Sequence, residues 1–161
     1  MIEVHQNIYI GTVQDCFSLS PDNWATVHAC KHPCHVRALN YTGSLPQSHP
    51  NYLVAERDRD LFLNMVDMER ELSPVFTNPI MEAAMAFIEK HSSSQRVLIH
   101  CNQGMSRAPS IALLHLARIG QIANETFENA ATSFKLKYPH YSPARGISLY
   151  MTRNWELIMA K

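Results

Sequence analysis

The sequence predicts an α/β domain in which a central sheet is covered by helices. Apolar and β-branched runs alternate with turn signals over the first half of the chain, and helix-period patterns dominate the second half. The run at residues 96–100 is apolar, as is typical of a strand in the middle of a mixed or parallel sheet. With 161 residues the chain can bury a sizeable core, so we expect a single domain over residues 1–161.

Strand patterns dominate the chain up to residue 66. Strands are expected at residues 4–10 (as a short hairpin), 24–30, 52–56 and 61–66. Residues 57–60, Arg-Asp-Arg-Asp, would turn a hairpin between the last two. Residues 31–51 contain three prolines and a glycine, which predicts an irregular surface excursion around one helical turn near residues 36–39.

Helix patterns follow. Helices are expected at residues 79–91, 107–119, 125–138 and 146–159. Pro79 suits a first helical turn because proline lacks the N–H that a helix start leaves unpaired, and Asn78 or Thr77 would cap it. Gly120 would end the second helix, and Asn124 would cap the third.

Composition excludes several classes of function. The 14 basic and 14 acidic side chains give a net charge of +0, so no bulk positive field attracts nucleic acid or an anionic membrane. No apolar run approaches the roughly 18 residues that span a bilayer, and the first residues lack a signal-peptide pattern. Four scattered cysteines are too few for a disulfide scaffold in a chain of this length. We therefore expect a cytoplasmic protein in a reducing compartment.

The stretch from residue 97 to residue 107 concentrates the chemistry. An apolar strand ends in His100-Cys101, five residues follow, and Arg107 then opens an apolar-periodic helix. A tight loop at a helix N-terminus turns its backbone N–H groups inward and binds anions. A thiolate at Cys101 would be stabilised by these groups and by Arg107, so the loop combines a nucleophile with a phosphate cradle.

This Cys-x5-Arg loop resembles the signature of protein tyrosine phosphatases, and Gly104 with Ser106 resembles the small dual-specificity branch. Residues 7–11, 62–67 and 138–143 are similar to the first strand, the strand before the general-acid loop and the C-terminal turn of that branch. The resemblance implies a mixed, largely parallel sheet flanked by helices. It also implies a monomeric enzyme that needs no cofactor and hydrolyses phosphotyrosine, and phosphoserine or phosphothreonine, in a phosphorylated protein or peptide.

The chemistry of phosphate-ester hydrolysis assigns a role to each residue. Cys101 is the expected nucleophile, and Arg107 provides a planar fork for two equatorial phosphate oxygens. Gly104 would adopt a backbone conformation that is costly for other residues. Backbone N–H groups of the loop complete the phosphate site, which is formed by Asn102, Gln103, Gly104, Met105, Ser106 and Arg107.

A general acid must come from upstream. Asp67 directly follows an apolar strand, opens a polar stretch and precedes the nucleophile by 101 − 67 = 34 residues, close to what the family pattern implies. It is therefore the expected acid. The other carboxylates considered are Asp58, Asp60, Glu69 and Glu71.

One position departs from the family pattern. The family usually has serine or threonine directly after the arginine, where the hydroxyl helps the thiolate leave, but this chain has Ala108. Slow breakdown of the phosphocysteine is expected unless Ser106 or Ser110 compensates. Two other functions stay open: a weakly catalytic module that captures phosphorylated partners, and a sulfur-transfer or arsenate-reducing enzyme.

Histidines and cysteines also cluster between residues 28 and 35. His28, Cys30, His32, Cys34 and His35 lie too close along the chain for the spaced pairs of a zinc site, and alternate strand positions do not converge easily, so no metal is expected. Cys16, Cys30 or Cys34 are potential disulfide partners of Cys101 on oxidation. His100 is expected to face away from the pocket, because neighbouring strand residues point to opposite faces.

Overall fold

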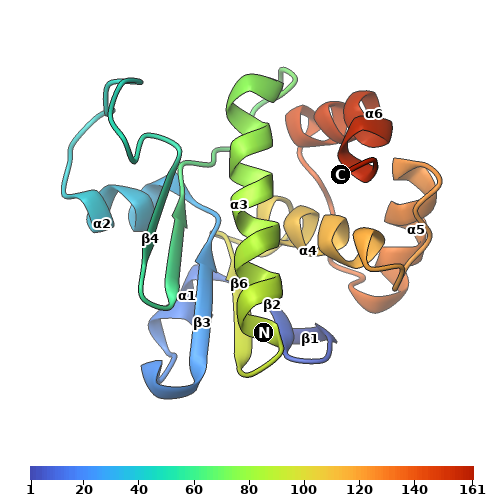
Figure 1. Cartoon of the computed structure of the whole chain (residues 1–161), viewed down its shortest axis with the longest axis horizontal. Coiled ribbons are helices and arrows are strands. Elements are labelled where there is room, and N and C mark those ends of the chain that lie inside the picture. The colour runs from blue at the N-terminus through green and yellow to red at the C-terminus, as the bar shows by residue number, and fades with distance from the viewer.

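The computed structural model describes residues 1–161, apart from the side chain of Pro21. Its sheet has six strands in the order β1-β2-β6-β3-β5-β4 (Figure 1). The strands are β1 (Ile2–His5), β2 (Ile8–Gly11), β3 (Trp24–His28), β4 (Val54–Arg57), β5 (Asp60–Leu63) and β6 (Arg96–His100). Strands β2, β6, β3 and β5 run parallel, and each edge strand returns antiparallel in a hairpin. The predicted mixed, largely parallel sheet is therefore confirmed.

Helices cover the sheet. They are α1 (Val13–Phe17), α2 (Val36–Leu39), α3 (Pro74–Ser92), α4 (Arg107–Arg118), α5 (Phe127–Lys137) and α6 (Arg145–Met159), with short helical segments η1 (Pro21–Asn23) and η2 (Lys31–His35). Helices α3 and α4 pack against the sheet, α5 and α6 pack on α4, and α1 contacts β2 and β6 (Figure 1). Among the residues described, no helix is long and apolar enough to cross a bilayer.

The core holds both ends of the loop between β6 and α4. Val97, Leu98 and Ile99 of β6 are fully buried, and every residue of α4 from Ala108 to Ala117 is buried. Close-packed side chains of this kind leave little freedom to the backbone that carries them. The strand end and the helix start are therefore fixed relative to one another, and the loop between them inherits that geometry.

Two predicted helix starts are wrong. Helix α3 begins at Pro74, so Pro79 lies inside the helix instead of in its first turn. Pro74 suits a first helical turn as well as Pro79 does, and the helix begins at Pro74, five residues before Pro79. Helix α5 begins at Phe127 and is capped by Thr126, whose hydroxyl accepts from the Asn129 N–H.

Burial of His115 on α4 makes stability sensitive to acid. Burial, with smaller electrostatic effects of the nearby His5 and Arg118 side chains, lowers the pKa of His115 from 6.5 to about 4. As pH falls below 6.5 the unfolded chain takes up a proton that the native chain excludes until about pH 4. This residue should therefore lower the free energy of unfolding by about 1.4 kcal/mol per pH unit across that window, while its stabilising contribution is intact above it.

The His115→Gln variant tests this expectation. Urea unfolding of the two proteins at several pH values between about 7 and 4.5 should give a shallower pH dependence for the variant, by about 1.4 kcal/mol per pH unit. Equal slopes for the two proteins would show that His115 takes up its proton at the same pH in the folded and unfolded chains.

Candidate active site

Residues 101–107, the phosphate loop, join β6 to α4. Cys101 lies at its base and is 2% exposed. Gly104 has φ +68°, and a Cβ added there would lie 3.0 Å from the backbone oxygen of Gly11. Both the left-handed backbone and the close approach exclude a side chain. The expected backbone conformation of Gly104, one that is costly for other residues, is confirmed.

Arg107 uses its whole guanidinium group within the site. Its Nε donates to Asp67 Oδ2 at 3.1 Å, its Nη1 to the Met65 backbone oxygen at 3.2 Å, and its Nη2 to Asn102 Oδ1 at 2.8 Å. The Arg107 side chain is only 11% exposed. The fork is thus held in one orientation by acceptors from two loops, and two of those acceptors are side chains that can move aside.

Asp67 lies in the acid loop, residues 64–73 between β5 and α3. One carboxylate oxygen accepts from Arg107, and the other accepts from Ser106 Oγ at 2.8 Å. Asp67 is thus the carboxylate that contacts the phosphate loop. The other four considered have other surroundings: Asp58 turns a hairpin, Asp60 contacts His28, Glu71 pairs with Arg153, and Glu69 is exposed.

A third segment, residues 138–146, supports both loops. Tyr138 Oη donates to the Gly104 backbone oxygen at 2.7 Å, and the Ser142 N–H donates to the Met105 backbone oxygen at 2.9 Å. The Ala144 N–H donates to Ser106 Oγ at 2.9 Å. The Gly146 N–H donates to the backbone oxygen of Met68 in the acid loop at 2.7 Å. This brace segment therefore links the loop that carries Cys101 to the loop that carries Asp67.

Hydroxyl groups near the loop are already engaged. The Ser106 hydroxyl donates to Asp67 and accepts from the Ala144 N–H. The Ser110 hydroxyl lies 3.1 Å from Tyr141 Oη in the buried core. Ala108 is fully buried at the start of α4. Neither serine is therefore free to replace the hydroxyl that Ala108 lacks.

His100 is not placed to act as a base on substrate. It is fully buried, and burial lowers its pKa to about 3. The ring is therefore neutral at neutral pH. Its Nε2 lies 2.7 Å from His28 Nδ1, and its Nδ1 lies 3.4 Å from the Cys101 backbone oxygen. His100 thus contacts the backbone of the phosphate loop at Cys101.

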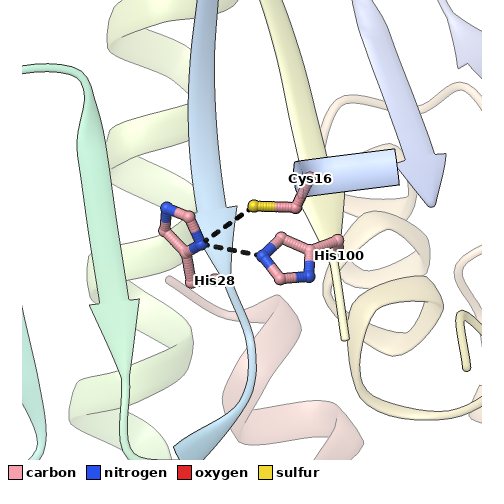
Figure 2. Close-up of side chains that lie close together, drawn as sticks. All are labelled: Cys16, His28 and His100. Atoms are coloured by element: carbon pink, nitrogen blue, oxygen red, sulfur yellow. Dashed lines mark hydrogen bonds between the residues drawn. The ribbon is translucent and has the colours of Figure 1, made fainter. Parts of the chain in front are cut away.

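The argument from sequence against convergence of the histidines and cysteines is wrong. His28 and His100 are register partners on adjacent parallel strands, and Cys16 reaches them from α1 (Figure 2). Cys34 approaches His100 from η2, and Cys30 approaches it from the residue directly before η2. His35 instead contacts Tyr41 Oη and the Asn51 backbone oxygen, and His32 is exposed. The sequence did not indicate this group because its members come from four elements.

A cavity of about 500 Å³ adjoins the acid loop. Val66 and Met68, which flank Asp67, lie in its wall with Tyr52 and Phe76. Cys101 and Arg107 are not part of that wall. The phosphate loop and this cavity are therefore neighbouring but separate features.

No protein-family model and no curated protein matches the sequence. Solved structures do match it in three dimensions. Human DUSP28 superposes with a TM-score of 0.63 at 14% identity, over 98% of this chain and 93% of that chain. The TM-score is 0.63 at 14% identity for DUSP15, with 96% and 86% covered, and 0.62 at 18% identity for PTPMT1, with 99% and 96% covered. The chain thus has the fold of the small dual-specificity phosphatases of the cysteine-dependent protein tyrosine phosphatase superfamily.

Proposed function

We propose that this protein is a phosphatase that hydrolyses phosphate monoesters of proteins through a phosphocysteine at Cys101. The observation that supports the proposal most directly is the contact between Arg107 and Asp67 at the rim of the phosphate loop. A nucleophile and an anion clamp from one loop meet there with a carboxyl group from a second stretch of sequence, which is the set that phosphoryl transfer to a thiol needs.

Substrate binding begins with an exchange of partners at Arg107. The incoming phosphate dianion accepts the hydrogen bonds that the Arg107 guanidinium group otherwise donates to Asp67 and Asn102. Asp67 then loses its cationic partner and lies beside a dianion, where its carboxyl group carries the proton that the leaving oxygen needs. Binding of the phosphate thus prepares the acid.

The reaction then has two steps. The Cys101 thiolate forms an S–P bond, the bond from phosphorus to the ester oxygen breaks, and that oxygen takes the proton from Asp67. Water next attacks phosphorus and gives a proton to the Asp67 carboxylate, and the S–P bond breaks to return the thiolate and release phosphate. Loop amides and Arg107 neutralise the equatorial oxygens in both steps.

The side chains of the phosphate loop favour phosphoproteins over more highly charged substrates. Asn102, Gln103 and Met105 are exposed around the site and all three are uncharged. A substrate with several phosphate groups would need cations for the additional charges. The structurally similar PTPMT1 has been solved with PI(5)P, but these neutral positions argue against an inositol lipid for this chain.

Rapid mixing with an aryl phosphate tests both the function and the effect of Ala108. A burst of the phenol product equal to the enzyme concentration is expected, followed by slow turnover, because no free hydroxyl assists the departing thiolate. Mass spectrometry after acid quench should find the phosphoryl group on Cys101. Ala108→Ser should raise steady turnover roughly 10-fold to 100-fold, the effect of one hydrogen bond to a charged group.

The other outcomes are distinct. Retained phosphopeptide binding with no product would favour the module that captures phosphorylated partners. Turnover of thiosulfate or arsenate in place of phosphate esters would favour the sulfur-transfer or arsenate-reducing enzyme. A phosphorylated Cys101 without a burst, with Ala108→Ser unchanged, would keep the phosphatase and contradict the slow second step.

A further inference from the structure

A group of thiols and imidazoles lies at the carboxyl ends of β3 and β6, outside the phosphate chemistry (Figure 2). His28 and His100 are the last residues of these two strands. Cys16 joins them from α1, and Cys34 joins from η2. We propose that Cys16, His28, Cys34 and His100 form a zinc site that stabilises the sheet behind the phosphate loop.

The donor atoms of Cys16, His28 and His100 all lie within 4.8 Å of one another, and Cys34 belongs to a second such group that shares His100. Cys16 Sγ lies 3.7 Å from His28 Nδ1, and Cys34 Sγ lies 3.8 Å from His100 Nε2. Zinc bonds of about 2.3 Å to sulfur and about 2.0 Å to nitrogen place such pairs about 3.5 Å apart. The two nitrogens, now 2.7 Å apart, would separate to about 3.3 Å. Cys34 Sγ, which is grouped with His100 but not with Cys16 and His28, would also have to rotate towards these two donors.

Each of the two rings has an inner nitrogen that faces the other ring and an outer nitrogen that faces an oxygen. The outer nitrogens are His28 Nε2 and His100 Nδ1. His28 Nε2 lies 2.9 Å from Asp60 Oδ1, a carboxylate oxygen that can only accept, so this nitrogen carries the proton. His100 Nδ1 faces the Cys101 backbone oxygen, another acceptor. The inner nitrogens, His28 Nδ1 and His100 Nε2, form a hydrogen bond at 2.7 Å, so the two protons of two neutral rings cannot satisfy this contact and both outer acceptors at once.

A cation between the two rings resolves this conflict. A metal-bound histidine usually donates its other N–H to a carboxylate or a backbone carbonyl, and these two histidines have one of each. Without a metal, either one neutral ring leaves its outer nitrogen without a proton, or one ring holds two protons. With a metal, both rings can stay neutral, since their inner nitrogens already face one another and their outer nitrogens face acceptors.

Charge and softness select the metal. Two thiolates and two neutral imidazoles give a donor set of charge −2, which neutralises one divalent ion in a buried site. Soft sulfur with imidazole favours zinc over magnesium or calcium, which prefer oxygen. Cys34, His28 and His100 are buried, whereas Cys16 is half-buried, so α1 provides the path of entry. Cys30 Sγ, within 4.8 Å of Cys34 Sγ and His100 Nε2, lies beside the donor set.

The experiment uses the full chain with Cys101→Ser, so that the nucleophilic thiol cannot bind the metal. After incubation with Zn²⁺ and dialysis, about one zinc ion per chain should remain. Co²⁺ in its place should give a thiolate-to-metal charge-transfer band and the intense visible bands of tetrahedral coordination. Adding Cys16→Ser, a small change at a half-buried site, should remove most of the charge transfer and weaken binding at least about 10-fold.

Two further variants separate a built site from chance binding. Asp60→Ala should weaken Zn²⁺ binding roughly 10-fold to 100-fold, because His28 loses the carboxylate that orients it. His32→Gln, a matched control at an exposed histidine of the same stretch, should bind as the parent does. Loss of zinc in the Cys101→Ser parent, or an unchanged Co²⁺ spectrum in a folded Cys16→Ser variant, would overturn the proposal. Neither result depends on phosphatase activity.

Discussion

Cys101→Ser should lower turnover of a phosphotyrosine peptide by roughly four orders of magnitude or more. A serine hydroxyl at the base of the loop is not ionised at neutral pH, and no free base lies beside it, since the His100 ring is buried against His28. Arg107 and the loop amides are untouched, so binding of the phosphopeptide should persist. Turnover is measured by phosphate release, and binding by fluorescence anisotropy of a labelled peptide.

The two readouts together decide between enzyme and binding module. An enzyme loses turnover and keeps binding in this variant, and its unfolding midpoint stays close to that of the parent because Cys101 is a small buried side chain replaced by a smaller one. If the parent chain also released no phosphate and bound the peptide as tightly, Cys101 would serve only to shape an anion site.

Asp67→Asn should have an effect that depends on the leaving group. With an alkyl phosphate, whose oxygen must be protonated as it departs, turnover should fall about 10²-fold to 10⁴-fold. With an aryl phosphate of low basicity the first step should change little. The amide also removes the charge that competes for Arg107, so the KM should fall together with kcat.

A matched control is available in the β4–β5 hairpin. Asp58→Asn makes the same carboxyl-to-amide change at a residue with φ 52°, a conformation that asparagine tolerates, and should leave both parameters unchanged. If Asp67→Asn kept full turnover on the alkyl phosphate, another group would have to supply the proton. A fall in kcat with an unchanged KM would instead show that Asp67 does not compete with substrate for Arg107.

Patterns within one element predicted most of the fold. The buried strand of residues 96–100 and the following helix were expected where β6 and α4 lie, because a continuous apolar run and a helical period leave few alternatives. The helical turn at Val36–Leu39 was also expected. Helix boundaries were less predictable: Pro74 and Pro79 both suit a first turn, and only packing of the whole helix selects between them.

In the candidate site, too, features within one stretch of sequence were predictable and contacts between elements were not. Cys101 and Arg107 share one loop, so their spacing alone indicates an anion site, and Asp67 follows its strand directly. The Asn102 contact to Arg107, the Tyr138 contact to Gly104 and the meeting of Cys16 with His28 depend on which elements become neighbours. Sequence separation gives no signal for such contacts, because sheet order and helix placement determine them.

The brace segment has a consequence for the newly made chain. Residues 138–146 hold both the phosphate loop and the acid loop, and they leave the ribosome after both of these loops. Until they dock, Gly104 and Met105 lack their external partners and Met68 lacks the Gly146 N–H. The proposed reactivity towards phosphate esters is therefore expected to arise only after the brace segment has docked, so that a chain without this segment holds an ordinary thiol.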